Sequence, residues 1–236
     1  MIELKNTHIG YTHTLFAIDD LTIKDRQLVS IIGPNGSGKT TFLNTILSIT
    51  PPLKGILKLD GKNIHTIHRT EKVKLISHVA SKFEGVPNLS VYELIAMGRA
   101  PYTNILNKLQ ANDKEVIEKV IDQLSLRDIQ HKSTTSISDG ERQIAMIGKA
   151  LAQETKIIVL DEPTAFLDYN NRRKVLNLLG EIAHSDNKII LLSTHDIDLC
   201  VQYSDMILAV NKKLDNLLTF KSLTSKDQLI KEVFDL

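Results

Sequence analysis

The sequence predicts an α/β protein whose parallel sheet carries a helical insertion. Apolar segments at 28–32, 156–163 and 188–196 have the length and composition of strands that are buried on both faces. A helical pattern at 172–183 separates the last two segments, as in the βαβ unit of a parallel sheet. Residues from about 80 to 150 have helical patterns instead, which indicates an insertion within the α/β body.

The N-terminal part of the chain is predicted to form short strands, because IELKNTHIGY and FAIDDLTIK alternate between apolar and polar residues. After the strand at 28–32, a glycine-rich turn leads into a helix predicted at 40–49, and Pro51 and Pro52 end this helix. A strand and a turn are predicted at 55–64.

The middle of the chain has the signals of helices. Ser90 and Glu93 have the S-x-x-E spacing of a capping box, which predicts a helix start. The segment 113–124 places five apolar residues on one helical face, namely Val116, Ile117, Val120, Ile121 and Leu124. The C-terminal segment 217–236 predicts one strand followed by one amphipathic helix.

The composition narrows the class of protein. The chain has 236 residues, of which 42% are hydrophobic and 24% charged, and its net charge is +1. This balance argues against a protein that binds nucleic acid by neutralising phosphates. Cys200 is the single cysteine, so no internal disulfide is possible, which fits a reducing compartment. The sequence shows no secretion signal and no run of eighteen apolar residues, so no membrane span is predicted.

The strongest functional signal is GPNGSGKTT at 33–41, which fits G-x-x-x-x-G-K-[ST] directly after a buried strand and before a helix. An ordinary glycine turn is the alternative, but the pattern and its context agree on a phosphate-binding loop. Lys39 is expected to reach the β- and γ-phosphates, and the Thr40 hydroxyl to bind Mg²⁺. The predicted nucleotide-binding residues of this loop are Gly33, Pro34, Asn35, Gly36, Ser37, Gly38, Lys39, Thr40 and Thr41.

Two further strand ends carry candidate catalytic groups. Asp161 and Glu162 end the apolar run within the segment 156–163, at the edge where open α/β sheets bind ligands. Asp161 is expected to hold Mg²⁺ and Glu162 to act as general base on the attacking water. His195 ends the neighbouring strand and is expected to reach the γ-phosphate. Solvated carboxylates and a structural histidine are the alternatives.

The base of the nucleotide is expected to contact Tyr11, whose ring could stack on a purine. The alternative is a tyrosine packed in a strand. The segment NKKLD at 211–215 nearly matches the guanine-binding N-K-x-D, but its spacing is one residue too long, so this motif is rejected.

A second anion-binding helix start is predicted at 134–146. Ser138 and Glu141 have capping-box spacing, and Gly140 between them permits close approach of the backbone to a ligand. The exposed N–H groups of the first turn favour an anion. A capping box without a ligand is the alternative for this stretch taken alone.

Together these motifs resemble the ATP-binding subunits of ABC transporters. The phosphate loop, SDGERQ, LDEP, AFLD and STHD follow one another in the family's order over nearly the whole chain. The resemblance implies a P-loop NTPase with a RecA-like α/β core, an antiparallel β subdomain and an inserted helical subdomain. It implies a single domain over 1–236, with the helical subdomain at about 80–150.

The resemblance also implies a role for the second helix start. ISDGERQ resembles the family's signature motif, normally L-S-G-G-Q, which binds the γ-phosphate held by the other subunit of a head-to-tail pair. Ser138, Asp139, Gly140 and Glu141 would then contact the partner's ATP, and two-fold symmetry would give two composite sites. Asp168 in AFLD resembles the D-loop that crosses the same interface.

One motif departs from the family. A glutamine is expected at the end of a strand that enters the helical insertion, but the matching segment 73–85 contains none. His78 is the nearest substitute by position, and it is expected to contact the metal or its water, although imidazole prefers softer ions than Mg²⁺. The alternative is a plain strand-end histidine.

Within the family, the segment 88–104 and SDGERQIAMIGKALAQ resemble the subunits of ferric-siderophore, haem and cobalamin importers. GR-x-PY lies where such subunits dock onto membrane subunits; the alternative for Arg99, Pro101 and Tyr102 is a helix stop with an exposed aromatic ring.

This resemblance implies an ATPase that uses ATP and Mg²⁺ to drive the uptake of an iron chelate or a related metal chelate. The implied partners are a second copy of the chain, polytopic permease subunits and, indirectly, a substrate-binding protein, with no nucleic acid. The implied location is cytoplasmic, on the inner face of the membrane. Alternatives are an importer of metal ions or cobalamin, a soluble ABC ATPase of nucleic acid or the ribosome, and a small-molecule kinase.

Overall fold

The computed structural model describes residues 1–104, 108–211, 213–221, 224 and 226–234, and in these residues ten strands form one sheet. The strands are β1 (Ile2–Gly10), β2 (Thr14–Ile23), β3 (Gln27–Ile32), β4 (Lys54–Leu59), β5 (Lys62–Asn63), β6 (Ile76–Val79), β7 (Ile157–Leu160), β8 (Ile189–Ser193), β9 (Met206–Asn211) and β10 (Asn216–Lys221). Their order in the sheet is β5-β4-β1-β2-β10-β9-β3-β8-β7-β6.

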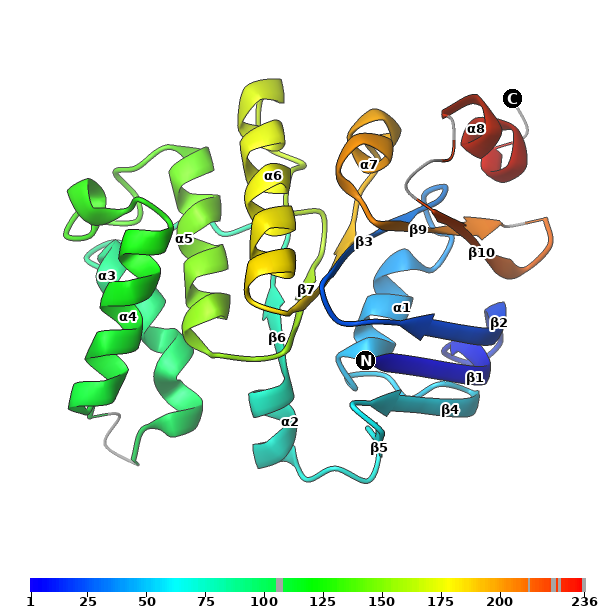
Figure 1. Cartoon of the computed structure of the whole chain (residues 1–236), viewed down its shortest axis with the longest axis horizontal. Helices are drawn as coiled ribbons and strands as arrows, with labels where there is room; N and C mark the ends of the chain where they lie inside the picture. The colour runs from blue at the N-terminus through cyan, green and yellow to red at the C-terminus, as the bar shows by residue number, and fades with distance from the viewer. Residues whose placement is uncertain (105–107, 212, 222–223, 225, 235–236) are drawn as a thin grey trace.

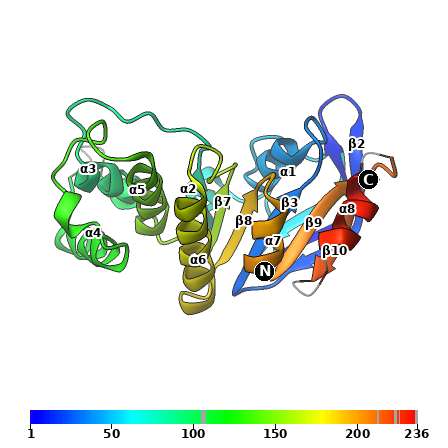
Figure 2. The same ribbon diagram turned by 90° about the horizontal axis from the view of Figure 1, so that it is seen from above.

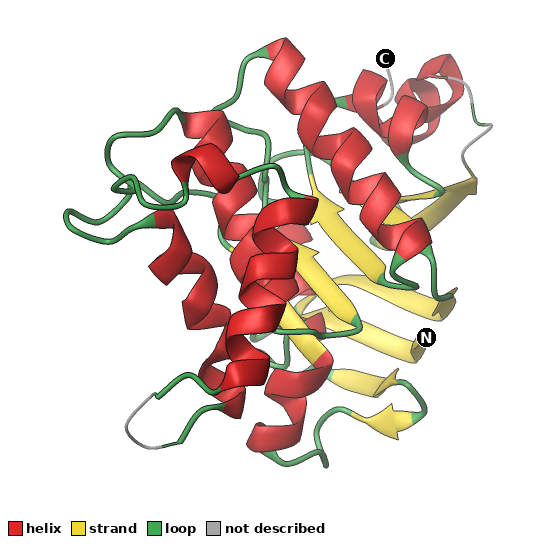
Figure 3. Cartoon of the chain, turned by 60° about the vertical axis from the view of Figure 1, so that its left-hand side comes forward, coloured by secondary structure: helices red, strands yellow, loops and turns green. Residues whose placement is uncertain are grey.

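The helices of the described residues surround this sheet (Figures 1 and 3). They are α1 (Lys39–Ile46), α2 (Arg69–Leu75), α3 (Val91–Ala96), α4 (Ala111–Gln123), α5 (Asp139–Ala152), α6 (Tyr169–Ser185), α7 (Ile197–Tyr203) and α8 (Lys226–Phe234), with short 3₁₀ helices at Met97–Tyr102 and Arg127–Ile129. The predicted α/β class and the helical patterns of the middle of the chain are therefore confirmed.

The sheet has a parallel part and an antiparallel part. Strands β9, β3, β8, β7 and β6 pair in parallel, and β7, α6 and β8 form the predicted βαβ unit. Strands β1, β2 and β4 pair antiparallel, as the alternating N-terminal segments suggest. Because parallel strands all end at the same edge, their carboxyl ends bring distant segments of the chain together.

The parallel strands are covered on both faces, which explains their continuous apolar runs. On one face, Val159 and Leu191 pack with Phe42, Leu43 and other residues of α1 and the antiparallel strands. On the other face, neighbouring residues of the same strands pack with α6 and with helices of the insertion. Figure 2 shows α1 on one side of these strands and α6 and α7 on the other.

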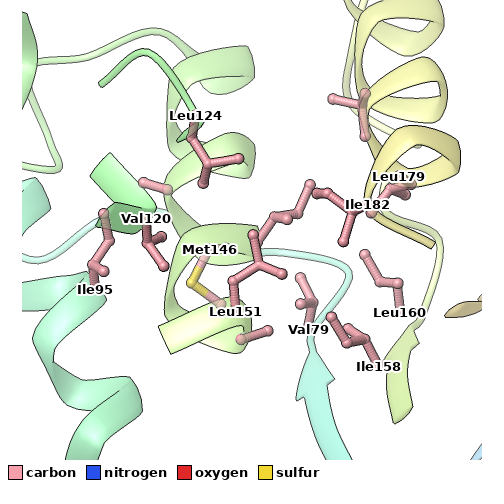
Figure 4. Close-up of a cluster of buried hydrophobic side chains, with 14 of the residues drawn as sticks. Val79, Ile95, Val120, Leu124, Met146, Leu151, Ile158, Leu160, Leu179 and Ile182 are labelled. Carbon is pink, nitrogen blue, oxygen red and sulfur yellow. The ribbon is translucent and has the colours of Figure 1, made fainter. Parts of the chain in front are cut away.

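The insertion shares its core with the sheet. Figure 4 shows Ile95, Val120 and Met146 from the helices at 91–152 in one buried cluster with sheet and α6 residues. The apolar face predicted for 113–124 is confirmed, because Ile117, Val120, Ile121 and Leu124 are buried and Val116 is half-buried. The capping box of Ser90 and Glu93 is also present.

Two predicted boundaries are wrong. The helix predicted at 40–49 ends at Ile46, because Ser48 adopts a left-handed φ of 58° and the N–H groups of Ser48 and Ile49 turn back to the carbonyls of Thr45 and Asn44. This is a Schellman ending, which stops a helix without proline or glycine. The segment 73–85 begins inside α2, so its strand is confined to Ile76–Val79.

The predicted C-terminal strand and helix are confirmed as β10 and α8, although residues 222–223, 225 and 235–236 lie outside the described residues. Lys212, in the rejected guanine motif, also lies outside them. Within the part of the chain that is described, none of the helices combines the length and apolar character that crossing a membrane requires.

Cys200 of α7 is buried in a third apolar cluster, with Ile32 of β3 and Ile207 of β9. Burial raises the pKa of its thiol to about 12, although a hydrogen bond with Ser30 partly opposes this shift.

Arg99 of the GR-x-PY segment is buried, with only 2% of its side chain exposed. Its Nε donates to Asp113 Oδ1 at 3.0 Å, its Nη1 donates to the Ala152 carbonyl at 2.8 Å, and its guanidinium lies over the Tyr102 ring. Tyr102 is half-buried, and its hydroxyl donates to the Gln153 carbonyl. The alternative of a helix stop is therefore confirmed, because the 3₁₀ helix ends at Tyr102, but its exposed aromatic ring is wrong.

Replacing Asp113 by Ala is expected to destabilise the protein by about 3 kcal/mol, because it removes the buried one of the two carboxylates that pair with Arg99 and leaves only the half-exposed Glu154, 2.6 Å from Arg99 Nη1. Asp113 also accepts the Gln110 N–H at the start of α4, so a helix cap is lost as well. Asp122→Ala, in the same helix and with an exposed side chain, is the matched control and should cost much less. Urea unfolding measures both, and equal losses would show that the Arg99 pair contributes nothing special.

Candidate active site

The predicted site residues gather at the carboxyl edge of the parallel strands. The loop after β3 carries the phosphate-loop residues, the loop after β7 carries Asp161 and Glu162, and the loop after β8 carries His195. Since β3, β8 and β7 are consecutive in the sheet, these three loops lie side by side. The position at this edge is where open α/β sheets bind their ligands.

The phosphate loop has the backbone that a cradle for an anion requires. Gly33, Gly36 and Gly38 have positive φ values of 152°, 68° and 102°, which other residues adopt only with strain. A Cβ at Gly38 would lie 3.1 Å from atoms of both Leu15 and Phe16, so a side chain there would also collide with β2. Such a glycine-rich turn at a helix start directs backbone N–H groups toward one point.

Lys39 and Ser37 point their polar groups into this loop. Lys39 is 6% exposed, and its Nζ donates to the Gly33 carbonyl at 2.9 Å and the Pro34 carbonyl at 3.3 Å. The Ser37 hydroxyl is buried and has no hydrogen-bond partner. Because buried polar groups are normally paired, this hydroxyl and the inward N–H groups fit a bound phosphate.

Oxygen atoms suited to a hard cation lie directly beside the phosphate loop. The Thr40 hydroxyl donates to Asp161 Oδ2 at 3.4 Å, and the Ser193 hydroxyl donates to Asp161 Oδ1 at 2.6 Å. Mg²⁺ binds through one or two protein oxygens together with water and phosphate oxygens, so this donor set fits it. In the described parts of the chain, no cluster of three or more His, Cys, Asp or Glu is placed to hold a metal ion.

Glu162 and His195 form a direct pair. His195 Nε2 lies 2.7 Å from Glu162 Oε1, and both side chains are partly exposed at the edge of the site. Glu162 has a left-handed φ of 46°, and its backbone N–H donates to the Ser193 hydroxyl at 2.8 Å. Ser193 therefore holds the Asp161 carboxylate and the Glu162 backbone at once, whereas the Glu162 carboxylate, which could accept a proton from water, is held by His195.

Tyr11 lies in the bend between β1 and β2 and is 60% exposed. It is therefore not a packed strand residue, and its ring is available for stacking. Contact with a purine remains a prediction.

The second predicted anion site begins α5 as expected. The Ser138 hydroxyl accepts the Glu141 N–H at 3.2 Å, and Glu141 Oε2 accepts the Ser138 N–H at 2.8 Å, so the capping box is confirmed. A Cβ at Gly140 would meet Asn171 of α6, whereas a Cβ at Gly33 or Gly38 would meet β2 or β9. The start of α5 and the phosphate loop before α1 therefore have different neighbours within one chain.

Asp139 brings a negative charge to the start of α5, where the family's motif normally has glycine. Arg142 offsets this charge, because its Nη1 donates to Asp139 Oδ1 at 2.7 Å. Arg142 also donates to the carbonyls of Thr134 and Ile137, which fixes its guanidinium beside the helix start. Asp168 caps α6 by accepting the Asn171 N–H at 2.9 Å.

His78 is not at the end of its strand, contrary to the expectation. It lies inside β6 opposite Val159, and it borders a hollow with Ser48 of the turn after α1 and Lys72 of α2. Partial withdrawal from water lowers the pKa of its ring, although the Asp161 charge opposes this shift. The Asp161 charge acts on this ring, and contact of His78 with a metal ion or its water stays a prediction.

Two serines and one arginine lie beside the candidate site although no sequence motif indicates a role for them. Ser81 is the first polar residue after β6, and with Gln143 it borders a hollow beside the start of α5. A correct prediction of the end of β6 would have indicated Ser81 as a residue of the following loop. Ser193 lies in the quoted STHD motif but received no role, since its contacts depend on the pairing of β7 with β8. Arg172 contacts the loops after both strands.

Comparison with known proteins agrees with this geometry. The family model described as ABC transporter matches residues 17–165, which is more than half of the chain. The chain belongs to the ABC transporter family. A petrobactin import ATP-binding protein of Bacillus anthracis is 35% identical over 190 residues, covering 80% of this chain and 70% of that protein.

Two solved structures extend the match to the fold. A transporter assigned to the metal-chelate type, in an inward-facing conformation, superposes with a TM-score of 0.83 at 29% identity, covering 100% of this chain and 89% of that one. A dimeric ATP-binding cassette in a post-hydrolysis state with ADP and Pi gives a TM-score of 0.77 at 25% identity, covering 95% and 100%. This ABC chain is an ATPase with the P-loop NTPase fold, and it binds adenine nucleotide.

Replacing Ser193 by Ala is expected to raise the Mg²⁺ concentration for half-maximal ATP hydrolysis about 10-fold or more, because Asp161 loses the donor that orients it. The same shift should appear in Mg²⁺-dependent thermal protection by a non-hydrolysable nucleotide. Ser185→Ala, at the exposed end of α6, is the control and should leave both curves in place. Unchanged curves for Ser193→Ala would remove this role.

Proposed function

We propose that this chain is the ATP-hydrolysing subunit of an ABC importer that takes up an iron chelate or a related metal chelate. The Glu162–His195 pair beside the phosphate loop carries the proposal for hydrolysis. The cargo is proposed from the petrobactin import relative and the metal-chelate type structure. Cargo selection itself would reside in a membrane subunit and a substrate-binding protein.

In the proposed reaction, water attacks the γ-phosphorus of ATP while Glu162 accepts its proton. The loop of Gly33, Pro34, Asn35, Gly36, Ser37, Gly38, Lys39, Thr40 and Thr41 holds the phosphates through N–H groups, the Lys39 ammonium and hydroxyls. His195 holds the Glu162 carboxylate before the nucleotide binds, and in this proposal it would donate to the γ-phosphate once ATP is bound. Mg²⁺, held by Thr40 and Asp161 in this proposal, would supply charge neutralisation for the developing transition state.

The proposal includes a head-to-tail dimer in which each chain completes the site of its partner. Within one chain the start of α5 and the phosphate loop have different neighbours. Two-fold pairing would place Ser138, Asp139, Gly140 and Glu141 on the nucleotide of the other chain, with Asp168 at the same interface. The dimeric cassette with ADP and Pi supports this arrangement by analogy.

Polytopic permease subunits are the proposed membrane partner, and they would hold the chain on the inner face of the cell membrane. We place their contact on the helical subdomain at about 80–150 of a single 1–236 domain, which includes GR-x-PY. Arg99 and Tyr102 anchor this segment to the end of α5, because they donate to the carbonyls of Ala152 and Gln153. The exposed residues of the segment would therefore already be ordered before a partner binds.

Glu162→Gln should trap an ATP-bound dimer, because the amide cannot accept the proton from water while the phosphate loop is unchanged. Size-exclusion chromatography with light scattering, at high protein concentration with MgATP, measures this. Lys39→Ala should abolish nucleotide binding, since it removes the buried ammonium of the loop. Glu181→Gln, on α6 and away from the site, is the control. A Glu162→Gln variant that stays monomeric would contradict the dimer.

The transporter assignment is tested by purifying the tagged chain from membranes in mild detergent. A polytopic membrane protein should copurify at equal copy number, and mass spectrometry identifies it. Recovery of ribosomal or DNA-bound partners, with no membrane protein, would leave the ATPase in place but contradict its role in import.

A further inference from the structure

A hollow of about 470 Å³ lies beside the Glu162–His195 pair. The loop after β7 forms one side of it, through Glu162 and Thr164, and the loop after β8 forms another, through His195 and Asp196. Arg172, from the first turns of α6, also lines this hollow. A cation therefore faces the space between the two loops that carry the catalytic pair.

Arg172 contacts both loops. Its Nε donates to the Leu167 carbonyl at 2.7 Å, and its Nη1 lies 3.5 Å from Asp196 Oδ2. Leu167 is buried and ends the loop after β7, whereas Asp196 directly follows His195. A planar guanidinium can hold two acceptors in a fixed geometry, which an ammonium cannot do.

These contacts close a ring of linked groups. Backbone hydrogen bonds fold the chain from Glu162 to Leu167 into consecutive turns. Arg172 joins Leu167 to Asp196, and Asp196 is fixed in turn because it caps α7 through the Leu199 N–H at 3.1 Å. The 2.7 Å contact between His195 and Glu162 completes the ring.

We propose that Arg172 is a positioning residue that holds the loop after β7 against the loop after β8, so that His195 meets Glu162. This inference rests on the proposed hydrolysis by Glu162 and His195. Arg172 touches neither reacting group; it sets their separation through Leu167 and Asp196. Because the phosphate loop has no part in the ring, losing Arg172 should slow hydrolysis while leaving ATP binding intact.

The chain provides a matched control in the next residue. Arg173 belongs to the same turn of α6 and has the same charge, but its Nε donates to the Tyr203 hydroxyl at 3.2 Å and its guanidinium lies near the Tyr169 ring. A general effect of charge or of helix α6 would appear in both variants. An effect of the ring would appear only at Arg172.

The test measures kcat and KM for MgATP with Arg172→Gln, Arg172→Lys and Arg173→Gln of the full chain. Arg172→Gln should lower kcat about 10- to 100-fold, a size typical of small misplacements of catalytic groups, with KM changed less than about twofold. Arg172→Lys should recover part of the loss, because one amine can reach only one of the two acceptors. Arg173→Gln should retain the wild-type kcat.

Asp196→Asn tests the same contact from the other side. The amide oxygen can still cap α7, but the charge that faces Arg172 is gone. Asp196→Asn should lower kcat in the same direction, and the double variant Arg172→Gln/Asp196→Asn should be no slower than Arg172→Gln alone, because both changes break one link. If Arg172→Gln fails to fold, Arg172→Lys and Asp196→Asn still decide the proposal.

Equal kcat values for the Arg172 and Arg173 variants would overturn the inference, and so would a rise in KM with kcat unchanged. A wild-type kcat for both Arg172→Lys and Asp196→Asn would also overturn it. A wild-type chain that binds ATP without hydrolysing it would instead contradict the proposed function, so the two failures are distinguishable.

Discussion

The parallel register of β7 against β8 governs the arrangement of the site. Leu160 lies opposite Leu192 in this register, so Asp161 follows one strand at the level where Ser193 ends the other. The Ser193 hydroxyl can then reach both Asp161 and the Glu162 N–H. A shift of one residue would turn every side chain of β7 to the opposite face and separate these groups.

Burial on both faces holds that register. The residues of β7 alternate between two apolar clusters, one under α1 and the antiparallel strands and the other under α6 and the helical insertion. Withdrawing β7 from these two clusters would expose both sets of side chains, at a cost of about 25 cal/mol for each Å² of apolar surface. The same packing that stabilises the fold therefore also fixes the oxygen atoms of the site.

Much of this arrangement follows from local sequence patterns. The phosphate loop, the βαβ unit and the capping boxes each depend on residues a few positions apart, so spacing alone predicts them. The expected strand-end position of His78 was wrong by one residue, because a four-residue strand after a helix gives little periodicity to locate. Its role at the metal stays a prediction. The end of α1 at Ile46 was missed because Ser48, a residue with no strong preference for a positive φ, forms the turn.

Side-chain contacts that only the fold creates could not be predicted from spacing in the sequence. Arg172 looks like an ordinary charged residue on a helix, and although Leu167 is a near neighbour in the chain, only the fold brings Arg172 to Asp196. Arg99 was assigned to a docking segment, although its side chain points inward to Asp113. In both cases one side chain has several partners that lie apart in the sequence, and no spacing rule describes such a set.

The burial of Cys200 also affects how this molecule can be studied. The thiolate is the reactive form of cysteine, and a thiol with a pKa of about 12, enclosed in an apolar cluster, offers almost none of it at neutral pH. A cysteine introduced at the exposed Phe166, in the loop after β7, would be the one readily modified sulfur. Spin labels or fluorophores attached there could test whether two chains approach and separate during turnover, as the proposed dimer requires, with the native cysteine left in place.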